Sequence, residues 1–394
     1  MFKTVIFFFA ALTLFSSCNC EKRNKDFVTY NIEEGIKIDQ KMNLSLIADD
    51  IFYIPLETTD ESIIADIMDI KFRDDYILVR DDLHQLLLFN RKGKFLKRIG
   101  EKGNGPNEYL HASEVLFSGT GKEIILFDGS KLKVMLFDIE SGKVLREVKI
   151  DFFPATFELY NDTTFAFYCS ELRNSNSGKY YHIYLMNNKL KVIDSLYYQT
   201  DFDDIEFFGF TKLYRKDNKL YCWNSNSDTI IYIDENKNLK NGFVFLFDKY
   251  RMPISIRSSM DFWKVKDDYF YIDNFIDTDN YMFINGIYKN TFMRDILYDK
   301  NEKSAKNIVF NYAFHDRGFH NDLDGSIPFW PKGSIDQSHL YDHISPFALK
   351  KLMDNAYYDD IVIKNSLKHE EIKTLLSQCT IYDNPIIFII QLKK

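Results

Sequence analysis

Short apolar segments follow one another along most of the chain, and turn residues bound each of them. Examples are YILVRD (76–81), QLLLFN (85–90), EIILFD (123–128) and KVMLFD (133–138). Most of these segments lack the polar alternation of a half-exposed strand, which is typical of strands covered on both faces. Aromatic residues favour packed strands, and the 394 residues include 36 Phe and 25 Tyr. The pattern predicts an all-β fold of many short, buried strands.

The strands recur at a fixed period. Residues 76–100 match residues 123–150, with Phe89 and Phe137 48 positions apart and Gly93 and Gly142 49 apart. A four-stranded unit that repeats every ~40–50 residues is typical of a propeller blade. Five such units are predicted, centred on Tyr76–Gly100, Glu123–Ile150, Thr164–Tyr198, Lys219–Phe247 and Asp268–Tyr298.

The rest of the chain, Lys306–Lys394, has to supply a sixth unit. Its pattern predicts a strand in NIVFNYAF (307–314), helices at Pro346–Ala356 and Lys368–Gln378, and a last strand in PIIFIIQLK (385–393). This unit is one strand short, and IFYIPLE (51–57) can complete it, which leaves no free sheet edge. We therefore predict a six-bladed β-propeller over residues 51–394, with two short helices in its last blade, closed by N- and C-terminal strands.

A glycine-rich segment, RIGEKGNGPNEY (98–109), raises the question of phosphate binding. A dinucleotide loop requires a helix directly after its glycines, and a P-loop requires Gly-Lys-Ser/Thr. Here Pro106 follows Gly105, and the residues after it favour a strand. We predict instead that the segment links the outer strand of one blade to the inner strand of the next, with Gly103 and Gly105 at positive φ.

The first residues indicate export and lipidation. Lys3 precedes an apolar run, Val5–Phe15, that is too short to span a bilayer and is typical of a signal peptide. Ser16 and Ser17 then precede Cys18, which resembles the bacterial lipobox except for the bulky Phe15. We predict a signal peptide at 1–17, a lipid on Cys18 and a tether and lead-in at 18–50. A signal peptide cleaved without lipidation is the alternative.

Charge and cysteine content narrow the possible partners. The formal net charge is −8 and there is no basic run, which argues against nucleic acid. Cys169 and Cys222 lie inside apolar runs, as expected of buried thiols, and no cysteine pair has the spacing of a metal site. The membrane, reached through the lipid, is the partner that the sequence predicts.

Candidate ligand-binding residues lie in loops on one face of the predicted ring, where the connections between blades and between second and third strands emerge. Glu108, Tyr109 and His111 are expected beside the channel there. The same face is expected to carry Asp81, His84, Asp128, Lys131, Arg173, Asn224, Asp273 and Asp277. For each Asp, turn formation at a strand end is the alternative interpretation.

A second group of candidates lies in the long loop FHDRGFHNDLDGSIPFWP (314–331), which includes Asp322, Asp324 and Trp330. DLDG begins like a calcium loop, but Ser326 and Gly333 stand where further ligands are expected. We predict no cofactor, with calcium as an open possibility. A surface loop packed by its own aromatic residues is the favoured interpretation.

Several segments resemble known proteins. LLLFNRKGKFLKRIGEKGNGPNEY (86–109) resembles the NHL repeat. YIPLETT (53–59), NDLDGSIPFWP (321–331) and DNPIIFIIQLK (383–393) are similar to the six-bladed β-propeller lipoproteins of Bacteroidota. The resemblance implies a propeller fold and a place in the bacterial cell envelope, with the outer membrane expected. It implies no reaction.

Two functions are compatible with these observations. The favoured hypothesis is a binding or scaffold module whose channel face holds a small molecule, a glycan, a peptide or another envelope protein. The alternative is a metal-dependent hydrolase or lyase of the six-bladed lactonase or NHL-lyase type. Such a metal would need several His, Asp, Glu or Asn side chains from different blades, and only His84 and His111 are imidazoles near the expected site.

Overall fold

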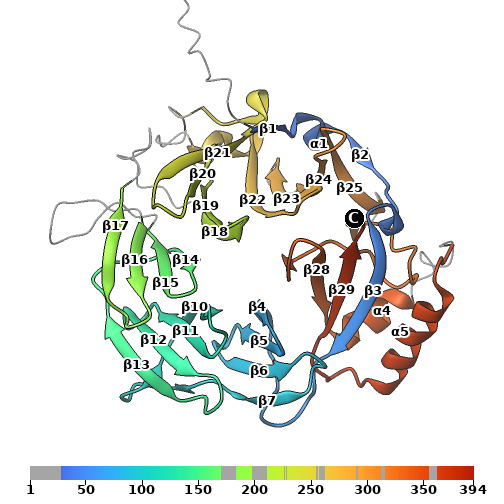
Figure 1. Cartoon of the computed structure of the whole chain (residues 1–394). Helices are drawn as coiled ribbons and strands as arrows, with labels where there is room; N and C mark the ends of the chain where they lie inside the picture. Colours follow the sequence, from blue (N-terminus) through green and yellow to red (C-terminus); the bar gives the residue numbers. More distant parts are fainter. Residues whose placement is uncertain are drawn as a thin grey trace, which may run out of the picture.

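The strands form a closed ring of blades around a central channel (Figure 1). This computed structural model describes residues 28–169, 183–197, 211–225, 227, 229–253, 256, 262–289, 292–311, 316–354 and 362–394. Within these residues, six antiparallel sheets of propeller type are present. The predicted all-β, six-bladed propeller is therefore confirmed.

The first four blades follow the repeat seen in the sequence, each running from an inner strand at the channel to an outer strand at the rim. Blade 1 consists of β4 (Ile67–Arg73), β5 (Tyr76–Asp81), β6 (Leu86–Asn90) and β7 (Phe95–Arg98). Blade 2 consists of β10 (Ala112–Phe117), β11 (Glu123–Asp128), β12 (Lys133–Asp138) and β13 (Val144–Lys149). Blade 3 consists of β14 (Thr156–Asn161), β15 (Thr164–Tyr168), β16 (Ile183–Asn187) and β17 (Val192–Leu196). Blade 4 consists of β18 (Thr211–Lys216), β19 (Lys219–Asn224), β20 (Thr229–Ile233) and β21 (Leu239–Leu246).

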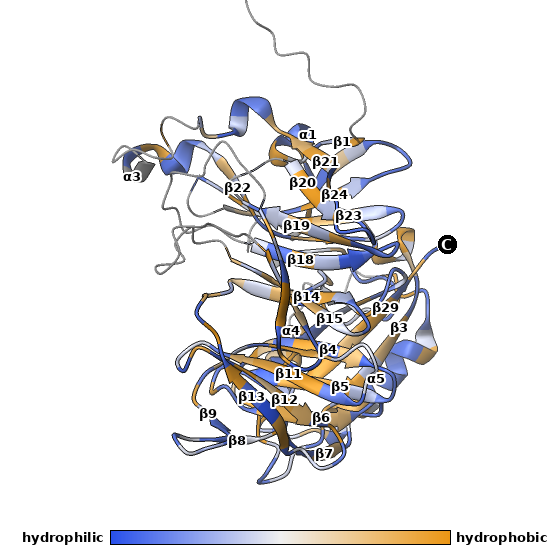
Figure 2. Ribbon diagram, turned by 60° about the vertical axis from the view of Figure 1, so that its left-hand side comes forward, coloured by the Kyte–Doolittle hydropathy of each residue, from blue (hydrophilic) through white to orange (hydrophobic). Residues whose placement is uncertain are grey.

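The matched glycines show why the repeat is regular. Gly93 and Gly142 occupy the same turn, between the third and fourth strands of blades 1 and 2, with φ of 80° and 68°. Glycine adopts such angles without strain, which suits both turns, whereas the corresponding turns of blades 3 and 4 hold Leu190 and Lys237 at φ of 57° and 63°. The strand interiors between these turns are apolar, as Figure 2 shows by hydropathy, and neighbouring blades pack face to face through them.

The last two blades divide the chain differently from the prediction. Blade 5 consists of β22 (Phe270–Asp277), β23 (Tyr281–Tyr288), β24 (Phe292–Asp299) and β25 (Ser304–Asn311). The assignment of NIVFNYAF to the sixth blade is thus wrong as far as residue 311, because Ser304–Asn311 pairs with β24 as the outer strand of blade 5. Residues 312–314 of that segment lie outside the described residues.

Blade 6 joins the two ends of the chain, as predicted. Its strands are β27 (Gly333–Ser334), β28 (His339–Ile344), β29 (Ile386–Leu392) and β3 (Ala48–Pro55), and β3 pairs antiparallel with β29 from Ile386↔Pro55 to Leu392↔Ala48. The predicted helices are present in this blade as α4 (Pro346–Met353) and α5 (Ser366–Gln378), and both follow β28.

A buried asparagine fastens this closure. Asn384 is 4% exposed, and its side chain accepts a hydrogen bond from the Ile64 N–H and donates to the carbonyls of Glu57 and Ser62. Because a buried amide with every group satisfied fixes geometry on both sides, Asn384 holds the C-terminal strand against the residues that follow β3.

The residues before β3 also pack on the ring. β1 (Val28–Asn31) pairs in parallel with the outer strand of blade 4, and β2 (Asp39–Gln40) pairs in parallel with the outer strand of blade 5. Between them, α1 (Glu33–Lys37) places Ile36 in the core between these blades. The N-terminal segment therefore covers two outer sheet edges that would otherwise be open.

Candidate functional site

The glycine-rich segment crosses from blade 1 to blade 2 as predicted, but its backbone differs. It runs from β7 to β10 and forms the small parallel sheet of β8 (Glu101–Lys102) and β9 (Glu108–Tyr109). The prediction of positive φ at Gly103 and Gly105 is wrong, since Gly100 and Asn107 carry the positive angles, 67° and 64°.

Glu108 explains why this segment needs its glycines. Its carboxylate accepts a hydrogen bond from the Gly105 N–H at 2.6 Å. A Cβ on Gly103 would lie 2.1 Å from the carboxylate, and a Cβ on Gly105 would lie 2.9 Å from the carboxyl carbon. The side chain is folded back into its own loop, so its observed contacts are structural.

The other candidates of this region divide into buried and exposed groups. Asp128 is fully buried and accepts the main-chain N–H groups of Leu110, Ser130 and Lys131. Asp81 occupies the equivalent position in blade 1, where it accepts from Gln85. Tyr109 is 2% exposed and packs edge-on against Phe137.

His111 is exposed and contacts His84, the rings lying 3.7 Å apart between centroids. Its Nδ1 lies 3.0 Å from the Ser113 hydroxyl. Burial, with a contribution from His111, lowers the pKa of His84. Both rings belong to the face where the blade crossovers emerge, which we call the crossover face.

The second group of candidates lies at the ring closure. Asp322 accepts hydrogen bonds from the Ser45 N–H and hydroxyl at 2.9 and 2.6 Å and pairs with Lys364 at 3.2 Å. Asp324 is fully buried and accepts from the Tyr53 hydroxyl of β3 and from the Ser326 N–H. The calcium-like DLDG motif thus has its two carboxylates engaged within the fold.

Trp330 packs behind this loop, 8% exposed and stacked on Phe319. His320 is half-buried. Arg173 and His315 lie outside the described residues.

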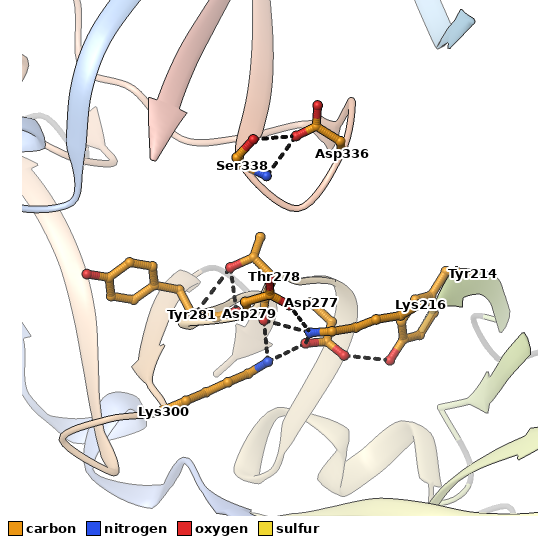
Figure 3. Close-up of polar contacts among 9 residues, drawn as sticks. All are labelled: Tyr214, Lys216, Asp277, Thr278, Asp279, Tyr281, Lys300, Asp336 and Ser338. Carbon is orange, nitrogen blue, oxygen red and sulfur yellow. Dashed lines mark hydrogen bonds and ion pairs between the residues drawn. The ribbon is translucent and has the colours of Figure 1, made fainter. Parts of the chain in front are cut away.

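Asp277 lies on the face opposite to the one predicted. It ends the inner strand of blade 5, so it faces the connection between the first and second strands. Figure 3 shows its carboxylate between Lys216 and Lys300, with Tyr214 donating to it at 3.0 Å. Asp279 lies 3.5 Å from Lys216, so two carboxylates face two ammonium groups and the cluster balances its own charge.

A further set of charges lines the channel and was not predicted. Asp69 and Lys71 on β4, Glu114 on β10 and Glu158 on β14 come from the inner strands of three consecutive blades. Lys71 and Asp69 are 3.2 Å apart, with side chains 34% and 20% exposed. Thr156 donates to Glu114 at 2.8 Å and joins blades 2 and 3.

The enclosure of these groups changes their proton affinities. Burial raises the pKa of Glu114 to about 7, although Lys71 and Thr156 limit the rise. Burial alone would lower the pKa of Lys71, but the carboxylates of Asp69, Glu114 and Glu158 more than offset it and raise the value. Across the channel, burial and repulsion from Lys71 lower the pKa of Lys212 to about 8.

An open pocket of about 480 Å³ lies at the channel mouth between blades 6 and 1. Its walls are Asp66 to Ile70 from blade 1 and Lys332, Tyr341 and His343 from blade 6. Met68 is 58% exposed although it lies on an inner strand, because the chain bulges there between Ile67 and Asp69. The pocket therefore combines an apolar side chain with carboxylates and an ammonium group.

The blade 6 wall is polar at its rim. Lys332 and Asp342 form an ion pair at 2.8 Å, and the Lys332 ammonium also donates to the His343 carbonyl at 2.8 Å. Burial, with the nearby Lys332 charge, lowers the pKa of His343 to about 3, so its ring is neutral at physiological pH. Burial raises the pKa of Asp342, and Lys332 opposes this rise.

Comparison with known proteins places this ring in a family. The family described as "Domain of unknown function (DUF4934)" matches residues 27–391. The chain belongs to the DUF4934 family. No curated protein matches the sequence.

Two solved structures that are similar to this DUF4934 protein come from Bacteroides species. A crystal structure named "Putative exported protein" from Bacteroides fragilis is 18% identical, with a TM-score of 0.71, over 93% of this chain and 100% of that one. A member of the DUF4221 family from Bacteroides vulgatus is 12% identical, with a TM-score of 0.49, over 88% of this chain and 97% of that one. At 18% identity, the likeness to the Bacteroides fragilis structure shows the fold alone.

The described residues of the DUF4934 protein lack two features. Across these ranges, no three His, Cys, Asp or Glu side chains are grouped so that they could hold a metal ion. In the same part of the chain, no helix has the length and apolar character needed to cross a membrane.

Proposed function

We propose that this DUF4934 protein is a lipid-anchored binding module of the cell envelope, and that it holds a compact polar ligand in the pocket at the channel mouth. The open pocket of about 480 Å³, with the exposed Met68 in its wall, is the observation that carries the proposal. Small-molecule sites are typically concave, about 300–1,000 Å³ in volume, and combine apolar walls with a few polar groups.

The charges of the pocket favour a ligand with an amine group. Asp66 and Asp69 line one wall and Lys332 lines the other. Lys332 is paired with Asp342 and Asp69 is paired with Lys71, so the carboxylate of Asp66 leaves the pocket with an excess of negative charge. Ligand contact by His111, which is exposed on the crossover face, stays a prediction.

The proposed location in the cell envelope is supported by the N-terminal sequence and by a protein of similar fold. Cys18 follows an apolar signal of the lipoprotein type, and the similar Bacteroides fragilis protein carries the word "exported" in its name. Anchoring in the outer membrane and the NHL-like character of the repeats rest on the sequence resemblance.

Blocking the pocket tests the proposal. A thermal-shift and calorimetric panel of amino acids, short peptides and mono- and disaccharides should contain at least one ligand whose affinity falls more than tenfold in Met68→Trp. Met293→Trp is the matched control, since Met293 is 42% exposed on β24 of another blade. If every ligand found binds Met68→Trp as well as the parent, or none binds the parent, the mouth pocket is not the site.

A further inference from the structure

The inner strand of blade 6 is much shorter than its neighbour. β27 pairs only Gly333 and Ser334, with Tyr341 and Leu340, whereas β28 continues to Ile344. If this register continued, Lys332 would lie opposite Asp342 and Pro331 opposite His343, and proline has no N–H to donate to the His343 carbonyl. Trp330, before it, is buried in the core. The inner strand therefore stops below the channel mouth.

The last channel-facing peptide group of β28 is satisfied by side chains instead of a strand. The main-chain N–H of Lys332 donates to the Tyr341 carbonyl. Among the described residues, this is the last main-chain hydrogen bond between the two strands. Beyond it, the His343 N–H donates to the Asp342 carboxylate at 2.6 Å. The His343 carbonyl accepts from the Lys332 ammonium at 2.8 Å.

These two side chains stand where a neighbouring strand would place a carbonyl and an N–H. In an antiparallel pair, a hydrogen-bonded residue gives its N–H and accepts at its C=O from one residue opposite. Asp342 and Lys332 reproduce both halves of that exchange at His343. The Lys332 side chain is 51% exposed, so it can turn into solvent at little cost, and the Asp342 side chain is 19% exposed.

We propose that the ligand of the mouth pocket is an extended peptide segment that adds to β28 as the missing upper part of the inner strand. The idea rests on the proposed function, because the position of the missing strand is the mouth pocket. The uncovered stretch, Asp342–Ile344, matches about three residues of an added strand at ~3.3 Å per residue. The pocket walls, with Met68 and the acids of β4, receive its side chains and amino terminus.

Strand addition already occurs twice in this molecule. β1 adds to β21 and β2 adds to β25, each on a blade edge and each from a distant part of the chain. Main-chain hydrogen bonds supply affinity in such complexes, and pockets for alternate side chains supply selectivity.

The test uses the tripeptide amide Ala-Val-Ala and its analogue methylated on the central amide nitrogen. With the full mature chain in detergent, calorimetry should show the methylated analogue binding at least tenfold more weakly, because it cannot donate to β28. Lys332→Met should bind the tripeptide about threefold more tightly, since the group that competes for the His343 carbonyl is gone. Lys240→Met is the control, because Lys240 is 52% exposed and pairs with Asp234 at 2.8 Å, much as Lys332 pairs with Asp342.

The outcomes separate this idea from the proposed function. Equal binding of both peptides, or weaker binding by Lys332→Met, would show that charge and not strand pairing holds the ligand. A second outcome is that the tripeptide fails to bind while the binding of another ligand is still weakened by Met68→Trp. That result would contradict the peptide proposal and support the pocket as the binding site. Tripeptide binding that is unaffected by Met68→Trp would place the peptide elsewhere and overturn the proposal.

Discussion

Buried and folded-back carboxylates organise the loops on the crossover face. Asp81 and Asp128 end equivalent strands in blades 1 and 2, and each accepts N–H groups of the loop beside it. Glu108 does the same within its own turn. A side chain that accepts hydrogen bonds from main-chain N–H groups fixes the shape of the loop. Removing it should therefore affect stability more than ligand binding.

Glu108→Ala should lower the free energy of unfolding by about 1 kcal/mol, because the Gly105 N–H loses a charged acceptor at 2.6 Å. Urea unfolding followed by fluorescence measures this. Glu101→Ala, at an exposed site in the same segment, is the control and should stay within ~0.5 kcal/mol of the parent. Parent-like stability of Glu108→Ala would mean that the carboxylate is not structural.

Glu114 should give the propeller a measurable pH dependence. Its pKa is raised from 4.5 to about 7 in the folded chain. Between those values the folded state binds more protons than the unfolded state, so this group lowers stability as the pH rises from 4.5 to 7. Glu114→Gln removes that loss, and its stability relative to the parent should rise by roughly 2–3 kcal/mol across the window. Urea unfolding at pH 5 and pH 8 tests this, and a pH-independent difference would contradict the raised pKa.

The charged side chains that line the channel could not be predicted from the sequence. Each of these residues lies inside a short apolar strand, and only the packing of three consecutive blades around the channel brings the four together: Asp69, Lys71, Glu114 and Glu158. A signal was present, since the segments IMDIKF, ASEVLF and TFELY each carry charge within a first strand. A single segment cannot show that its polar side chain faces a channel and not solvent.

At the scale of elements, the outer strand of blade 6 is held by a side-chain latch as well as by its strand partner. Tyr53 of β3 donates to the buried Asp324, and the same loop meets Ser45 through Asp322. His369 of α5 approaches the Asp324 carbonyl at 2.6 Å. The long loop and α5 thereby fix the strand that closes the ring.

Tyr53→Phe should destabilise the protein by roughly 2 kcal/mol, because the buried Asp324 loses a hydrogen-bond donor while the ring packing against Phe388 is retained. Thermal and urea unfolding report the change. Tyr382→Phe, at a tyrosine that is 86% exposed, is the matched control. Equal stability of the two variants would rule out the latch.

Strands of blades 1 to 4 and both helices of blade 6 could be predicted because local periodicity and turn residues mark them. The boundary between blades 5 and 6 could not, since Ser304–Asn311 fits either blade by pattern and its partner strand decides. β28 was missed because HLYDHI mixes polar and apolar residues, and its polar members serve the mouth pocket.

At the scale of the whole molecule, the proposed lipid on Cys18 and the ring are separable. Residues from Val28 onward pair with the outer edge of blade 4, and Cys18 precedes Val28 by ten positions. Cys18→Ser should move the protein from the membrane to the soluble fraction without changing its melting temperature, since stable anchoring requires the acyl chains. Fractionation and immunoblotting decide this, and a variant that stays in the membrane would contradict lipidation at Cys18.

The pairing of β3 with β29 also determines when the ring can close during synthesis of the chain. Ile64 and Asn384 are hydrogen-bonded although 320 positions separate them, so blade 6 must wait for nearly the entire chain. Contacts between such distant residues form slowly, because the loop-closure entropy is lost before the contact is made. The proposed signal peptide would therefore meet a chain whose ring is still open. In that case the pairing that stabilises the finished propeller would also delay ring closure until after export.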